Sequence, residues 1–162
     1  MPFHFENKPS LIAYVTCGDP DLATTRQIIL AAIDADASVI ELGVPFSDPL
    51  ADGPVIQRAS ERALKHRVSL QNVLTLASEI REQSQSVGLV IFSYLNPILR
   101  MGLPKFCQVA RLAGVDGTLI TDLHEGAPSK LRLGGLFRHV PEVSPIYFDA
   151  PRACSSVKRM KR

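Results

Sequence analysis

Short apolar runs alternate along the chain with longer segments whose apolar residues recur at helical spacing. The apolar runs predict four buried strands, at residues 11–16, 39–44, 87–94 and 117–121. The amphipathic segments predict helices at residues 22–37, 55–65, 70–80 and 104–112. Strands that are apolar along their whole length and alternate with helices are typical of a parallel sheet with helices packed on it. The pattern therefore predicts an α/β fold.

Local signals refine where these elements begin and end. Asp19 is expected to be the N-cap, and Pro20 the first helical residue, of the helix that follows the first strand. Ser69 is expected to cap the third helix. Asn96 and Pro97 are expected to end the third strand, because the residue before a proline favours an extended or turn conformation.

Charge divides the chain in two. Residues 1–127 hold 10 Lys and Arg against 14 Asp and Glu, whereas residues 128–162 hold 8 against 2. The second part is a divergent basic tail without a clear period, although residues 145–149 could form a fifth strand. Its apolar residues argue against a nucleic-acid-binding arm, which would be poor in them. We interpret the tail as a segment whose coding sequence has drifted or shifted frame.

Composition indicates one ordinary globular domain of 162 residues, with 46% hydrophobic and 21% charged residues. Without an apolar run of roughly 20 residues or a secretory signal, we expect a cytoplasmic protein that binds no membrane. The three cysteines lie far apart, which predicts neither a disulfide framework nor a metal site. The histidines lack metal-ligand spacing, and no glycine-rich nucleotide loop is present.

The sequence VIELGVPFSDPLADGP, residues 39–54, contains the candidate chemistry. Glu41 lies within the second predicted strand, and an unpaired buried carboxylate is costly. Asp48 and Asp52 lie in the loop of prolines and glycines that follows. Polar clusters at the carboxyl ends of parallel strands are where such folds bind ligands. From the residues alone, Glu41 could instead pair with a Lys or Arg, and the aspartates could be turn residues.

Four motifs extend this reading: YVTCGDPD, IELGVPFSDPLADGPVIQRA, FSYLNPILRMG and GVDGTLITDL. Their order and spacing resemble the tryptophan synthase α chain over roughly residues 11–126, and SPIYFDAP at residues 144–151 is similar to a weakened fifth strand of that family. The resemblance implies a (β/α)8 TIM barrel, of which this chain supplies only about four to five βα units. Residues 1–127 would be the N-terminal half of that barrel.

The resemblance also implies an activity, the retro-aldol cleavage of indole-3-glycerol phosphate to indole and glyceraldehyde 3-phosphate in tryptophan biosynthesis. Glu41 would be the general acid/base, and Asp52 would polarise the indole N–H. Burial at a strand end raises the pKa of a carboxyl group, which suits proton exchange near neutral pH. Asp48 remains a turn residue in this interpretation. The chain itself would need no cofactor.

Other residues receive roles through the same resemblance. An indole pocket would be lined by Tyr14, Ile56, Phe92 and Tyr94. Asp122, directly after the fourth strand, would support the loop over the site. By default, an aromatic residue on a buried strand belongs to the core, and Asp122 could be only a helix cap.

The implied partner is a tryptophan synthase β chain, which carries pyridoxal phosphate, in an α2β2 heterotetramer. Pro45, Asn96 and Pro97 are the candidate partner contacts, and no nucleic-acid partner is expected. A competing hypothesis is a catalytically inactive, truncated α-type subunit that only binds or modulates a β chain. A different phosphosugar barrel enzyme is a third hypothesis, and the motif ELGVPFSDPLADGP argues against it.

Overall fold

The computed structural model of the chain describes residues 10–122 and 144–146. In this part of the chain, one parallel sheet has its strands in the order β1-β2-β3-β4-β5. The strands are β1 (Leu11–Thr16), β2 (Ala37–Gly43), β3 (Gly88–Ser93), β4 (Gly117–Ile120) and β5 (Ser144–Ile146). Each strand pairs with the next one along the chain. This sequential order is that of a (β/α) barrel, whereas a doubly wound sheet reverses its strand order.

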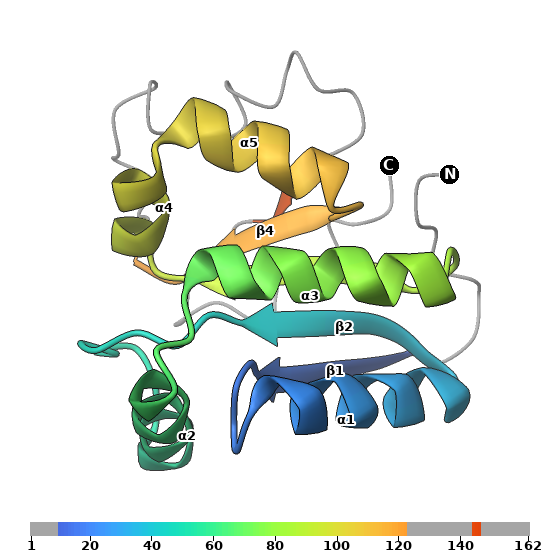
Figure 1. The fold of residues 1–162 in the computed structure, drawn as a ribbon, viewed down its shortest axis with the longest axis horizontal. Helices are drawn as coiled ribbons and strands as arrows, with labels where there is room; N and C mark the ends of the chain where they lie inside the picture. The colour runs from blue at the N-terminus through green and yellow to red at the C-terminus, as the bar shows by residue number, and fades with distance from the viewer. Residues whose placement is uncertain (1–9, 123–143, 147–162) are drawn as a thin grey trace.

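Helices connect the strands and cover one face of the sheet. They are α1 (Leu22–Asp34), α2 (Pro54–Lys65), α3 (Leu70–Gln83), α4 (Leu95–Met101) and α5 (Leu103–Leu112). Figure 1 shows α1, α3 and α5 side by side on this face, whereas α2 and α4 lie toward the carboxyl ends of the strands. None of the helices within residues 10–122 is long and apolar enough to cross a bilayer.

The main core lies between the sheet and these helices. Successive strand residues point to opposite faces, so Ile40, Leu42, Leu89 and Ile91 project toward the helices, where all four are fully buried. The predicted apolar stripe of α3 completes this core: Leu70, Val73, Leu74, Ala77 and Ile80 are all buried. Val39, Val90 and Leu119 pack together as a separate cluster. The two clusters confirm that both faces of β2, β3 and β4 are apolar. The prediction that residues 11–16 are buried was wrong for Leu11 and Ile12, which are exposed because β1 lies at the edge of the described sheet.

The N-terminus of α1 differs from the sequence prediction. Asp21, not Asp19, is the N-cap, and its Oδ1 accepts a hydrogen bond from Thr24 N at 2.7 Å. Asp19 instead pairs with Arg62 of α2, with two hydrogen bonds of 2.7 Å each. The prediction was wrong because a long-range partner for Asp19 cannot be read from local sequence. The predicted cap at Ser69 is confirmed, since its side chain accepts from Asn72 N.

Two further boundaries are corrected. Helix α1 ends at Asp34 and β2 begins at Ala37, so the predicted helix was too long and the predicted strand began two residues late. Asp36 has a positive φ of 65°, which no α-helix accommodates and which Asp tolerates better than most residues. The chain therefore turns there.

The dipeptide Asn96-Pro97 does not follow the third strand as a turn, because both residues belong to α4. Pro97 is the third residue of that helix. Its missing N–H costs no hydrogen bond there, since the first N–H groups of a helix have no partner within it. The prediction missed this helix because it treated proline only as a breaker.

The amino-terminal edge of the sheet is held by one ion pair. Arg81 Nη2 of α3 lies 2.7 Å from Asp116 Oδ2, which immediately precedes β4. The guanidinium also donates to the backbone carbonyls of Ser84, Val87 and Gly114. One side chain thus joins α3 to the segments that enter β3 and β4.

Strand β5 overlaps the predicted fifth strand at residues 145–149, beginning at Ser144 and pairing in parallel with β4. Residues 147–149 and the predicted boundary after residue 127 lie outside the described residues. Most of the basic tail does too, so the interpretation of that segment stays a prediction.

Candidate functional site

Glu41 lies on the face of the sheet opposite α1, α3 and α5. In the register of the strands it lies between Tyr14 of β1 and Val90 of β3. Residues in register on neighbouring strands project to the same face, as does Val39, two positions before Glu41. The carboxylate therefore projects from an otherwise largely apolar surface, near the carboxyl end of β2.

The surroundings of Glu41 favour its neutral form. The side chain is half-buried, and this loss of solvent raises the pKa of its carboxyl group. Within residues 10–122, no Lys or Arg forms an ion pair with it. The alternative that Glu41 is a structural carboxylate with a basic partner therefore finds no support in the described part of the chain. A half-buried, unpaired carboxyl group is suited to proton transfer near neutral pH.

Tyr14 and Phe92 form an aromatic wall beside Glu41. Their rings meet edge to face, with centroids 5.1 Å apart. Gly43 makes this placement possible, because a Cβ at that position would overlap the Tyr14 hydroxyl. Burial is the main reason that the pKa of Tyr14 is raised to about 12, and the charges of Asp52 and Glu41 add to the effect. Tyr14 therefore lies within electrostatic range of both candidate carboxylates.

Asp52 lies in the segment between β2 and α2 and is held from two sides. Its Oδ2 accepts a hydrogen bond of 3.0 Å from the Tyr94 hydroxyl, and its backbone carbonyl accepts one of 2.9 Å from Gln57 Nε2. Partial burial raises the pKa of the Asp52 carboxyl group, and the hydrogen bond from Tyr94 opposes that rise. The tie to Tyr94 joins this loop to the end of β3.

Tyr94 is itself firmly placed. Only 5% of the residue is exposed, and its ring lies 5.0 Å from that of Phe46. Its hydroxyl accepts a hydrogen bond of 2.8 Å from Ala51 N as well as donating to Asp52. Burial raises the pKa of Tyr94 to about 12, so the hydroxyl keeps its proton at neutral pH.

Asp122 and Ile56 lie on neighbouring segments. Asp122 follows β4, and its Oδ1 accepts a hydrogen bond of 2.8 Å from Leu95 N, the first residue of α4. The Asp122 carboxylate thus caps the N-terminus of α4, a helix that precedes Asp122 in the chain. Ile56 lies in the first turn of α2 and is partly buried. Their roles in loop support and substrate binding stay predictions.

The candidate partner contacts differ in their exposure. Asn96 is exposed and Pro97 is partly buried, both in the first turn of α4. Pro45 is buried, directly after Val44, whose N–H donates to Phe92 O at 2.8 Å. Of the three, Asn96 has the side chain most available to another molecule.

Sequence reasoning missed Gly43, Phe46 and Gln57. A glycine inside a strand often marks a close approach of another group, so Gly43 carried a usable signal. Phe46 and Gln57 carried none, because their importance comes from contacts with Tyr94 and Asp52. These contacts exist only once β2, β3 and α2 are assembled.

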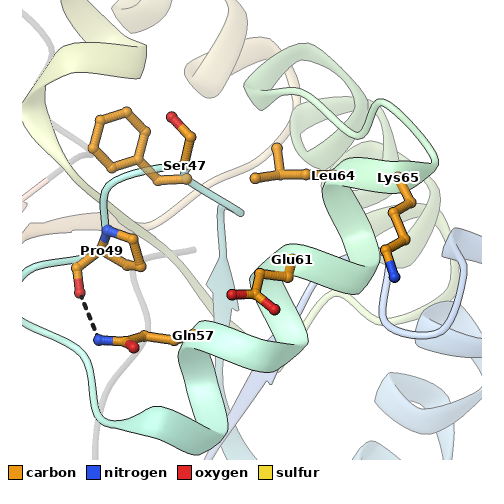
Figure 2. A pocket seen from close by; sticks show the side chains of 7 residues that line it. Ser47, Pro49, Gln57, Glu61, Leu64 and Lys65 are labelled. Atoms are coloured by element: carbon orange, nitrogen blue, oxygen red, sulfur yellow. Dashed lines mark hydrogen bonds between the residues drawn. The ribbon is translucent and has the colours of Figure 1, made fainter.

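A separate cavity of about 550 Å³ lies between α2 and the loop after β2 (Figure 2). Figure 2 shows Ser47 and Pro49 on the loop and Gln57 on the helix, with the hydrogen bond of 3.5 Å from Gln57 Nε2 to Pro49 O. The cavity is lined by Phe46, Ser47, Pro49, Gln57, Glu61, Leu64 and Lys65. The lining of this cavity does not include Glu41, Asp52 or Tyr14.

The geometry supports acid–base chemistry on an aromatic ligand. Two carboxyl groups with raised pKa values, Glu41 and Asp52, lie near the hydroxyl-bearing ring of Tyr14 at the carboxyl edge of the sheet. Among the described residues, no cluster of three or more His, Cys, Asp or Glu could hold a metal ion. Cys17 and Cys107, the two cysteines within this part of the chain, are free and buried.

Comparison with known proteins gives these features a family context. A family model described as tryptophan synthase alpha chain matches residues 3–153. A tryptophan synthase alpha chain from Nitrosomonas europaea is 50% identical over 117 residues, covering 72% of this chain and 42% of the relative. Another from Dechloromonas aromatica is 44% identical over 155 residues, covering 96% and 56%. The chain spans about half the length of the curated relatives it matches.

Solved structures agree. Tryptophan synthase subunit alpha from Legionella pneumophila superposes with a TM-score of 0.80 at 37% identity, covering 86% of this chain and 52% of that one. A tryptophan synthase complex from Pyrococcus furiosus gives 0.76 at 38% identity, with 85% and 55% covered. The described sheet and helices thus form part of a TIM barrel of this type.

Proposed function

Because the chain belongs to the tryptophan synthase alpha chain family, we propose that it provides the proton-transfer residues of a carbon–carbon lyase. The substrate is indole-3-glycerol phosphate, and the products are indole and glyceraldehyde 3-phosphate. The observation that carries this proposal is Glu41, a half-buried carboxyl group that has a raised pKa, lies beside the Tyr14–Phe92 wall and has no ion-pair partner among residues 10–122. That wall provides an apolar, aromatic surface of the kind an indole ring packs against.

The proposed roles follow from the reaction. The bond between the indole ring and the glycerol side chain breaks only after indole C3 accepts a proton, which turns the ring into an electron sink. Glu41 donates this proton to C3, and the resulting carboxylate then accepts the proton lost from the glycerol hydroxyl. Its raised pKa makes both protonation states accessible. Asp52 accepts a hydrogen bond from the indole N–H and stabilises the positive charge that develops on the ring. No step needs a cofactor in this chain.

The test is a direct assay for indole. We expect the purified, folded chain to release indole from indole-3-glycerol phosphate, measured by chromatography, and to form indole-3-glycerol phosphate from the two products in the reverse direction. A matched sample of the chain unfolded in denaturant provides the control. A folded chain that saturates with substrate and yields no indole would contradict a lyase and favour a subunit that only binds a partner.

We further propose a tryptophan synthase β chain as the partner, in an α2β2 assembly whose pyridoxal phosphate belongs to the β chain. Support comes from the similarity to the structure of the tryptophan synthase complex from Pyrococcus furiosus. The carboxyl edge of the sheet, where indole would be released, is the surface best placed to pass it to a partner. Exposed Asn96 at the start of α4 offers a polar contact there. A biosynthetic role and buried free cysteines favour the cytoplasm.

Substitution of Asn96 tests this surface. We expect Asn96→Ala to weaken β-chain binding roughly tenfold, since truncation of a polar contact at an interface costs about that much when the partner group is left unpaired. Titration of labelled β chain measures the dissociation constant. Gln108→Ala is the matched control, because Gln108 is an exposed amide on α5, away from this edge. Equal dissociation constants for both variants would place the interface elsewhere.

A further inference from the structure

The Tyr94 hydroxyl makes two contacts with the loop that carries Asp52. It accepts from Ala51 N at 2.8 Å and donates to Asp52 Oδ2 at 3.0 Å. The two contacts join consecutive loop residues to one oxygen atom of the residue that directly follows β3. Ala51 is exposed and Asp52 only partly buried, and Gln57 contacts the backbone carbonyl of Asp52 and not its carboxylate.

Tyr94 is a rigid anchor for such a contact. It directly follows β3 and is the N-cap residue of α4. Its backbone carbonyl accepts a hydrogen bond of 2.9 Å from the Ser93 hydroxyl, and Ser93 O accepts one of 3.1 Å from Thr121 N. With its ring against Phe46, the side chain has few alternative positions. Because the Tyr94 hydroxyl is fixed in this way, it can hold the Asp52 carboxylate in one orientation.

On this geometry we propose that Tyr94 is a positioning residue, whose hydroxyl fixes the orientation of the Asp52 carboxylate toward the substrate. This inference rests on the proposed function, and it gives Tyr94 a role different from that of a wall of the indole pocket. A carboxylate that is already oriented pays no ordering cost when the ring charge develops, which is how preorganised groups accelerate reactions. The direct ligand contact remains that of Asp52.

The charges around Asp52 make the contact measurable. Tyr94 and Tyr14 both have pKa values raised to about 12, so both stay neutral throughout the range in which Asp52 titrates. Glu41, like Asp52, acts electrostatically on Tyr14, and a Tyr94 substitution leaves Glu41 in place. The hydrogen bond from Tyr94 favours the ionised carboxylate and holds the Asp52 pKa down against burial. Removing the hydroxyl must therefore raise that pKa.

The variant Tyr94→Phe removes the hydroxyl and keeps the ring that packs on Phe46. In the full chain labelled with ¹³C-aspartate, we expect the Asp52 carboxyl resonance to titrate at higher pH in this variant than in the wild type. We also expect kcat for indole release to fall roughly ten- to hundredfold with KM nearly unchanged, the effect of losing a hydrogen bond to a charged group. Circular dichroism checks that the variant is folded.

Gln57→Met is the matched control, because it removes the hydrogen bond to the Asp52 carbonyl and leaves the carboxylate contact intact. We expect the Asp52 midpoint to stay at its wild-type position in this variant. An unchanged midpoint in Tyr94→Phe would overturn the proposal, and so would a rise in KM with unchanged kcat, which indicates a pocket wall. If the wild type releases no indole, the proposed lyase function fails, whereas the titration still decides whether Tyr94 holds Asp52.

Discussion

Glu41→Gln is expected to lower kcat/KM for indole release by roughly 10²–10⁴-fold, the usual cost of losing a general acid/base. Glutamine has nearly the same volume and keeps a polar end, but it cannot exchange a proton at neutral pH. The loss should appear in kcat, because the residue acts on the reacting atoms. Single-turnover assays with saturating substrate measure it. Wild-type turnover in Glu41→Gln would remove Glu41 from the mechanism.

Two aspartate variants from the same loop complete this test. Asp52→Asn should also lower kcat strongly, because it removes the charge that the indole N–H would meet. Asp48→Asn is the matched control, since Asp48 is exposed and belongs to the same turn sequence. A comparable loss in Asp48→Asn would show that the loop tolerates no substitution, and the assignment of Asp52 would then fail.

Stability provides an independent readout for Glu41. Because burial raises the folded-state pKa of Glu41 above its ordinary value of 4.5, the native state binds this proton more tightly than the unfolded state. The resulting stabilisation is fully present below pH 4.5 and is lost as pH rises through the raised folded-state pKa. Glu41→Gln should therefore gain stability relative to the wild type across that window. An opposite trend in denaturant titrations would mean that Glu41 has a stabilising partner.

Arg81→Met is expected to destabilise the fold by roughly 2–4 kcal/mol, as for other broken ion pairs that are largely buried. In the wild type, Arg81 Nη2 lies 2.7 Å from Asp116 Oδ2. Methionine keeps the apolar stem of Arg81 but removes this cation from the Asp116 carboxylate. Asp116 Oδ2 also accepts a hydrogen bond of 2.8 Å from Leu89 N, so the effect reaches β3. Chemical denaturation, with the slope m fitted for each protein, measures the loss.

Arg62→Met is the matched control. Its ion pair with Asp19 has the same N–O distance of 2.7 Å, but half of the Arg62 side chain is exposed, against 15% for Arg81. Solvent screens such surface pairs, so we expect a far smaller loss of stability. If both variants lose the same amount, the burial of Arg81 is not what makes its pair important.

Much of the fold follows from the sequence because its signals are local. Continuous apolar runs place four strands within one or two residues, and Ser69 caps α3 as its type and position predict. The errors occur where a distant residue decides. Asp19 fits an N-cap by sequence, but Arg62 of α2 takes its carboxylate, and Asp21 caps α1 instead. Pro97 fits a turn, yet it lies in the first turn of α4, where it costs no hydrogen bond.

The sequence by itself determined the family motifs, the alternation of strands and helices, and the choice of Glu41 and Asp52 as candidate chemistry. These depend on residue identity and on spacing along the chain. Only the tertiary structure decided that Tyr94 holds Asp52, that Gly43 makes room for Tyr14, and that Arg81 joins two strand entries. The Tyr94–Asp52 and Arg81–Asp116 contacts join residues 42 and 35 positions apart. Parallel strands bring these residues together only after the intervening helices have folded back across the sheet.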